Sequence, residues 1–140
     1  MPVLGKILSI EEIKERLAPL FREEGLELVL LFGSAATGDM HGKSDVDLAF
    51  LFNRSVDILS LTNKVIRLLH IDDVDVIDLN HASPLLKFVA AKKGRLLYER
   101  SPGAFNEFCS LAFRMYVDTK KLRDLNAKAI KYFLETRRLI

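Results

Sequence analysis

Two aspartates, Asp45 and Asp47, open an apolar segment that has the alternation of a β-strand, and they carry the clearest chemical signal in the chain. Side chains alternate along a strand, so the two carboxylates share one face with Ala49 while apolar side chains occupy the other. Like charges at this spacing repel each other and resist burial. The pair therefore predicts either a solvated strand end or a site for a cation.

A second signal is Gly33-Ser34, which ends the preceding apolar segment. Gly33 permits a tight turn and a close approach of the backbone, and Ser34 supplies a hydroxyl beside the amides of a turn that can begin a helix. Such a loop suits a phosphate group. Taken separately, each motif is most often structural. Taken together, and with a third aspartate on a later strand, they indicate nucleotidyl transfer.

The third carboxylate comes from a β-branched segment over residues 74–79, which offers Asp75 and Asp78. The two lie on opposite faces of a strand because the side-chain period is two. If Val74 and Val76 pack into the same core as the strand of Asp47, then Asp75 faces the side that carries Asp47. Asp75 is therefore the preferred ligand. Asp78 is the alternative, with a role in the following turn as its expected use.

Three carboxylates suit Mg²⁺, a hard cation that keeps some water and takes its remaining ligands from phosphate. Two such ions can activate an attacking hydroxyl and neutralise a departing pyrophosphate. The sequence has no Ser-His-Asp, Cys-His or zinc-like spacing that would favour other chemistry. We therefore expect Asp45, Asp47 and Asp75 to be both the metal ligands and the catalytic residues. Asp75 can also be the base that deprotonates the acceptor.

The remaining sequence predicts the elements that must position these residues. Ser9 and Glu12 form a capping box for a helix that Gly25 ends, and Ser55 or Val56 lies near the cap of a second helix. Alternating helices and strands predict an α/β or α+β sheet domain. We expect a core over residues 1–100 and a helical tail over 101–140, packed on the same single domain. The expected strands are 26–32, 45–52, 74–79 and 95–99, and the expected helices are 10–24, 57–70, 84–93 and one or two within 103–137.

Composition limits the function classes. The net charge of +2 over 140 residues is too small to argue for nucleic-acid binding. A single cysteine, Cys109, excludes an intramolecular disulfide and fits a reducing compartment, with core packing as its expected role. The N-terminal segment lacks the apolar stretch of a signal peptide, and no apolar run is long enough to span a membrane. We therefore expect a cytoplasmic protein.

The tail between residues 114 and 138 is basic, with eight cationic and three acidic residues, a balance of 8 − 3 = +5. Its aromatic residues recur at helical spacing. Either the charges form a solvated helix face or the tail docks on a partner. Direct nucleic-acid binding is the weaker reading, because the aromatic residues are spaced like core residues.

The motifs together resemble those of the minimal nucleotidyltransferases in the DNA polymerase β-like superfamily. In that family Gly-Ser is followed by ten residues and then Asp-x-Asp, as in Gly33-Ser34 and Asp45-Val46-Asp47. The family's third aspartate opens a later strand in a Val-Asp-hydrophobic context, which is the position of Asp75. The likeness extends through Leu79-Asn80 to the tail. It implies the nucleotidyltransferase fold, a small mixed sheet flanked by helices with a long C-terminal helical tail.

Within that superfamily the chain is most similar to the antitoxins of toxin–antitoxin pairs whose toxin is a HEPN-domain ribonuclease. The resemblance implies Mg²⁺-dependent transfer of AMP from ATP to a hydroxyl of the toxin, a tyrosine in particular. Ala35 and Thr37 depart from the pattern, because many relatives carry Arg or another large residue there, and Lys43 is a candidate to replace them. The alternatives are a weak or inactive antitoxin that neutralises by binding, and a transferase that acts on a small molecule.

Overall fold

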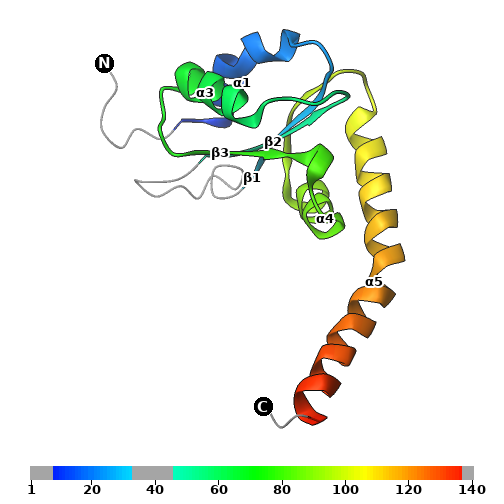
Figure 1. Cartoon of the computed structure of the whole chain (residues 1–140). Coiled ribbons are helices and arrows are strands. Elements are labelled where there is room, and N and C mark those ends of the chain that lie inside the picture. Colours follow the sequence, from blue (N-terminus) through cyan, green and yellow to red (C-terminus); the bar gives the residue numbers. More distant parts are fainter. Residues whose placement is uncertain (1–7, 33–45, 137–140) are drawn as a thin grey trace.

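A four-stranded mixed sheet with helices on both faces forms the centre of the computed structural model, which describes residues 8–32 and 46–136 (Figure 1). The strand order is β3-β2-β1-β4. Strand β1 pairs antiparallel with both β2 and β4, whereas β2 pairs parallel with β3. The strands are β1 (Leu26–Phe32), β2 (Val46–Phe52), β3 (Val74–Asp78) and β4 (Arg95–Glu99).

The helices divide between the two faces of the sheet. Helices α1 and α3 cover one face, and α4 with the first part of α5 covers the other (Figure 1). Helix α3 also connects the parallel strands β2 and β3, because a parallel pair needs a crossover. The helices are α1 (Ile10–Leu17), α3 (Ile58–Leu69), α4 (Pro84–Lys93) and α5 (Ala104–Thr136), with short 3₁₀ helices over Ala18–Arg22 and Leu79–His81.

The first helix confirms the predicted cap but not the predicted length. The Ser9 side chain accepts a hydrogen bond from the Glu12 amide at 3.1 Å. The α-helix ends at Leu17 and continues as the 3₁₀ helix Ala18–Arg22. The reason is Pro19, which has no amide to donate to the turn before it. The prediction of one helix running to Gly25 was therefore wrong.

Helix α3 begins one position later than predicted. Its N-cap is Asp57, whose carboxylate accepts hydrogen bonds from the amides of Leu59 and Ser60. Neither Ser55 nor Val56 is the cap. The negative charge of the Asp57 carboxylate also interacts favourably with the partial positive charge of the helix N-terminus. Asp57 is therefore a stronger cap than Ser55 or Val56.

The tail is one helix, α5, of 33 residues. Its first part packs on the sheet through Phe105, Phe108 and Ala112, and Phe88 of α4 stacks on Tyr116 with ring centroids 4.0 Å apart. The second part leaves the domain and projects from it (Figure 1). None of the helices in the described part of the chain has the length and apolarity that a membrane crossing needs.

Candidate active site

The parallel pairing of β2 with β3 brings two of the predicted carboxylates together. Asp47 is the register partner of Asp75, between the pairs Val46–Val74 and Leu48–Val76. Register partners in neighbouring parallel strands point to the same face and lie about 4.8 Å apart along the hydrogen-bonding direction. Two aspartates 28 positions apart in sequence thus become neighbours on one surface.

The start of this pairing is fixed by the backbone. The amide of Val46 donates to the carbonyl of Asp73 at 3.0 Å, so β2 is joined to β3 one residue before the aspartates. A slip of one residue would send Asp47 to the opposite face, because the side-chain period is two. The apolar residues that alternate with the carboxylates prevent such a slip, since they would then leave the core.

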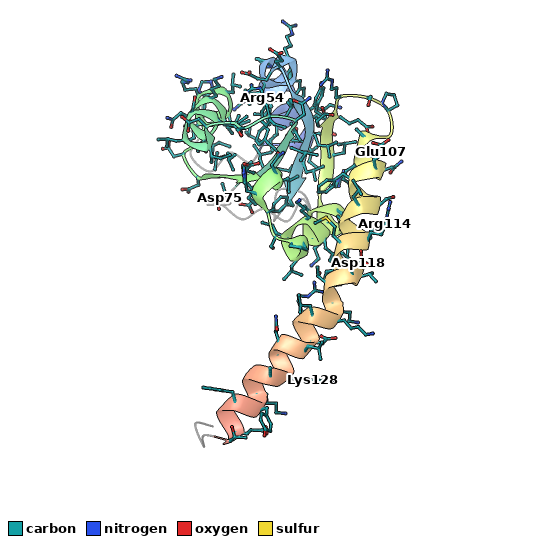
Figure 2. All side chains as sticks on the ribbon, turned by 45° about the vertical axis from the view of Figure 1, so that its right-hand side comes forward. Arg54, Asp75, Glu107, Arg114, Asp118 and Lys128 are labelled. Atoms are coloured by element: carbon teal, nitrogen blue, oxygen red, sulfur yellow. The ribbon has the colours of Figure 1, made fainter. Side chains whose placement is uncertain are left out.

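The face that carries Asp47 and Asp75 is the one that α4 and α5 cover in part. Val46, Val74 and Val76 pack in the core under α1 and α3. Asp47 and Asp75 therefore point to the other face. Asp75 is exposed on the edge strand β3 (Figure 2). Asp47 on β2 is partly exposed. The geometric condition under which the sequence favoured Asp75 is met in the structure.

Asp78 lies on the same strand but has a different environment. It is the register partner of Phe50, so it faces the side opposite to Asp75. Its carboxylate accepts a hydrogen bond from the Asn80 amide at 3.0 Å and lies 2.6 Å from Nδ1 of His81. These contacts hold the 3₁₀ turn after β3, which is the use that the sequence suggested for Asp78.

Three of the predicted site residues, Gly33, Ser34 and Asp45, lie outside the described residues, as do Ala35, Thr37 and Lys43. Their nearest described neighbours lie at the site. Phe32, which precedes Gly33 in the chain, is the register partner of Asp47 on β1. Within residues 8–32 and 46–136, no three acidic, histidine or cysteine side chains are grouped closely enough to hold a metal ion. Asp47 and Asp75 are two of the three predicted ligands, and both offer the carboxylate oxygens that Mg²⁺ prefers.

Asn80 is a residue whose role the sequence did not reveal. Its side-chain amide donates to the carbonyl of Phe52 at 2.6 Å and accepts from the amide of Phe52 at 3.0 Å. One side chain thus takes the place of a strand neighbour beyond the end of β3 and holds the end of β2. The only signal in the sequence was the resemblance over Leu79-Asn80, which carries no information about these contacts.

Cys109 has the packing role that was predicted for it. It lies half-buried on α5, and its thiol is 3.8 Å from the carbonyl oxygen of Ala91 in α4. Burial raises the pKa of the Cys109 thiol. A nucleophilic cysteine needs the opposite shift, so this thiol is poorly suited to covalent catalysis.

Paired carboxylates on a parallel strand pair, in a small mixed sheet flanked by helices, are the arrangement that the sequence led us to expect of a nucleotidyltransferase. Comparison with protein families supports the same class. The model of the family described as polymerase beta, nucleotidyltransferase, matches residues 11–103. The chain therefore belongs to the polymerase beta nucleotidyltransferase family.

Individual proteins extend this likeness over the tail. The chain is 29% identical to the protein adenylyltransferase MntA of Aphanizomenon flos-aquae (strain 2012/KM1/D3), over 93% of this chain and 95% of that protein. A crystal structure of a toxin–antitoxin with AMP-PNP is similar with a TM-score of 0.74 and 27% identity, over 89% of this chain and 99% of that one. A structure of a tri-AMPylated Shewanella oneidensis HEPN toxin in complex with MNT antitoxin matches with a TM-score of 0.70 over 87% and 98% of the two chains. At its 24% identity, that likeness concerns the fold.

Proposed function

We propose that the chain is a Mg²⁺-dependent protein adenylyltransferase that transfers AMP from ATP to a tyrosine hydroxyl of a HEPN-family toxin and thereby neutralises it. The observation that carries the proposal is the in-register pair Asp47–Asp75. The proposal is supported by the adenylyltransferase name of the Aphanizomenon flos-aquae relative and by the AMP-PNP of the similar toxin–antitoxin structure.

In this proposal Asp45, Asp47 and Asp75 hold the metal, and Gly33 with Ser34 holds the phosphates. When bound there, Mg²⁺ would neutralise charge on the triphosphate and activate the attacking hydroxyl. Because Asp75 is exposed on the edge strand, we assign to it the contact with an acceptor that arrives from solvent.

The transfer itself requires no covalent intermediate with this chain. The toxin hydroxyl oxygen forms a bond to the α-phosphorus of ATP, and the bond from that phosphorus to the oxygen bridging to the β-phosphate breaks. Pyrophosphate leaves with the electron pair of the broken bond, and the hydroxyl proton passes to a carboxylate, Asp75 in this assignment. Chemistry of this kind depends on positioning and on charge stabilisation.

A second candidate is neutralisation by binding alone. It is favoured by the exposed apolar side chains on the second half of α5, which the domain leaves uncovered. In that case the acidic residues are not needed for protection, and a partner that covers α5 is sufficient.

Labelled ATP distinguishes the two. The purified chain is incubated with a purified HEPN-family toxin and with ATP labelled at either the α- or the γ-phosphate. AMP transfer labels the toxin from α-labelled ATP only, requires Mg²⁺ and stops with EDTA. The double variant Asp45→Asn/Asp47→Asn removes two proposed ligands, and Asp78→Asn is its control on the opposite face.

The outcomes separate the candidates. Loss of label with the double variant and its retention with Asp78→Asn support the transferase. Absence of label with the wild type, or equal labelling with the double variant, contradicts it. Protection of cells by the double variant at wild-type level supports neutralisation by binding.

A further inference from the structure

Exposed side chains follow one face of α5 at alternating intervals of four and three residues. This is the heptad spacing by which one helix packs along another. The face includes Leu111, Leu122 and Leu125, which are 55%, 60% and 60% exposed, and Tyr132, which is 70% exposed. We call it the exposed seam: Leu111, Met115, Asp118, Leu122, Leu125, Ala129 and Tyr132.

The exposed seam is distinct from the face by which α5 packs on its own domain. That packed face runs through Phe108, Ala112 and Tyr116, and it ends where the guanidinium of Arg123 lies 4.2 Å from the centroid of the Tyr116 ring. Arg123 also donates to the hydroxyl of Thr119. Successive residues turn by about 100° around a helix, which places the seam roughly a quarter-turn from the packed face.

Beyond Arg123 the helix has no support from the domain in the part of the chain that the structure describes. Every described side chain from Asp124 to Thr136 is exposed. Figure 1 shows this part of the helix projecting past the domain. At about 1.5 Å per residue, residues 124–136 span about 20 Å. Helical segments of this length are marginal in water unless an apolar face is packed. The seam therefore indicates a partner.

Charges beside the seam indicate what kind of partner. Arg114, Lys121 and Lys128 each precede a seam residue, so they form one flank of it, and all three are exposed. Arg114 and Lys128 are labelled along α5 in Figure 2. In helix pairs the flanking positions face the flank of the partner. A partner helix with acidic flanking residues is complementary to this row of cations.

A second copy of the chain does not offer that complement. An antiparallel pair centred on Lys121 places Arg114 opposite Lys128 and Lys121 opposite its own copy, so cations meet cations. A parallel pair in register places Asp118 against Asp118 inside the seam and sets Thr119 and Asn126 opposite the cations. Like charges in such positions disfavour pairing.

Asp118 adds a further requirement. It is exposed in the free chain, and it is the acidic member of a seam that is otherwise apolar up to Tyr132. A carboxylate covered by a partner costs free energy unless it meets a cation or a hydrogen-bond donor. A polar group at one seam position thereby specifies register, as it does in coiled coils.

From this arrangement we propose that the exposed seam of α5 docks an amphipathic helix with acidic flanks and a cationic residue opposite Asp118. The proposal rests on the proposed function in one respect, which is that this helix belongs to the protein that receives AMP.

The test uses the full chain and two synthetic helical peptides of four heptads. Both carry leucine at the core positions and one arginine opposite Asp118, and they differ in having glutamate or lysine on the flanks. We expect the glutamate peptide to bind at least about tenfold more tightly, with an advantage that shrinks in high salt. Fluorescence anisotropy of the labelled peptides measures both affinities.

Two matched pairs of variants locate the binding. Leu125→Glu places a carboxylate in the seam and weakens binding of the glutamate peptide by about tenfold or more, whereas Ala127→Glu, two residues away on another face, leaves it within about twofold. Lys121→Glu weakens it by about threefold or more, and the neighbouring Lys120→Glu, on the side opposite the seam, does not. Equal affinity for the two peptides, or equal effects within either pair, overturns the proposal.

Parallel measurements with the HEPN protein separate this proposal from the proposed function. Without ATP, Asp45→Asn/Asp47→Asn binds the toxin like the wild type and Leu125→Glu does not. If the wild type labels the toxin and Leu125→Glu labels and binds it equally well, the docking proposal is wrong and the transferase stands. If no protein labels the toxin but the peptide pairs behave as expected, the transferase is wrong and the seam stands. A wild-type dimer that Leu125→Glu dissociates in sedimentation overturns the proposal.

Discussion

The carboxylate end of β2 and β3 and the projecting part of α5 both carry residues that folding does not require. At the first, Asp47 and Asp75 place like charges side by side on a sheet. At the second, Leu122 and Leu125 leave apolar side chains 60% exposed. The carboxylates repel each other, and the apolar side chains of α5 lack packing partners. Binding of a cation to the first region and of a partner to the second would relieve these free-energy costs.

The two regions differ in how rigidly they are held. The aspartates alternate with residues of the main core, so the sheet fixes their positions before any ligand arrives. Every described side chain of the projecting part of α5, from Asp124 to Thr136, is exposed, so the core does not fix its position. The rigid sheet thus suits the proposed AMP transfer, which needs precise positions. The less constrained helix suits partner recognition, which tolerates small adjustments. Substitutions at the carboxylates should therefore leave the affinity of the exposed seam for its partner helix unchanged.

The largest effect is expected at the carboxylates. Asp75→Asn lowers the rate of AMP transfer on the order of 10²- to 10³-fold, because it removes the carboxylate that we propose binds Mg²⁺ and accepts the hydroxyl proton. Asp78→Asn, on the same strand but the opposite face, changes the rate only a few-fold. Rates come from α-labelled ATP with the toxin as acceptor. Similar losses in both variants would contradict the assignment of Asp75, and an altered affinity for the glutamate peptide would contradict the separation of the two regions.

The next largest effect is expected when the same Phe→Ala substitution is made in each of the two parts of α5 and the free energies of unfolding are compared. Phe108 is 8% exposed in the core and Phe133 is 47% exposed on the projecting part. Phe108→Ala lowers the free energy of unfolding by about 3 kcal/mol or more, because it leaves a cavity. Phe133→Ala changes it by less than about 0.5 kcal/mol. Urea titrations of the free chain measure both, and equal losses would show that the second part of α5 packs on the domain in solution.

Much of this arrangement could be predicted because it repeats along the chain. The alternation of Val46 with Asp47 and of Val74 with Asp75 was sufficient to predict a shared face once the strands are neighbours. The helical period predicted the packed residues Phe105 and Phe108. The predicted division at residue 100, the Gly33-Ser34 loop and Asp45 remain predictions.

Features that depend on a single distant contact or on the extent of the domain could not be predicted. The Asn80 side chain makes hydrogen bonds to the backbone of Phe52, 28 positions away, and no helical or strand periodicity predicts such a contact. The N-cap of α3 could have been any of three consecutive residues, Ser55, Val56 or Asp57. The sequence alone does not show which of them has the geometry of a cap. Helix α5 carries two apolar faces, and only the size of the sheet decides that Phe108 is covered and Leu125 is not.

An intermediate effect tests the hydrogen bonds that hold the end of β2. Asn80→Ala leaves the amide and carbonyl of Phe52 without their side-chain partner, which costs about 1–3 kcal/mol of the free energy of unfolding. Asn53→Ala is the control, because the Asn53 side-chain amide donates to the Glu27 carboxylate at the surface, at 3.1 Å. This substitution should cost less than about 0.5 kcal/mol of the free energy of unfolding. If thermal and urea unfolding show equal losses, Asn80 does not hold the strand.

The smallest effect uses Cys109 as a reporter of the packed part of α5. Because burial raises the pKa of its thiol in the folded chain, the thiolate that reacts with iodoacetamide is scarcer there than in the unfolded chain, whose thiol titrates near about 8.5. The folded chain should therefore be alkylated several-fold more slowly at pH 8 than the same chain in urea. Burial of the neutral thiol stabilises the folded chain below the unfolded pKa, and this stabilisation is lost as the pH rises through the folded pKa. Leu125→Glu should leave the alkylation rate unchanged, whereas Phe108→Ala should raise it, because only the second loosens the contact between α4 and α5. A faster alkylation of Cys109 in Leu125→Glu would mean that the two parts of the helix are coupled. Partner binding on the projecting part would then affect the packing of α5 on the domain.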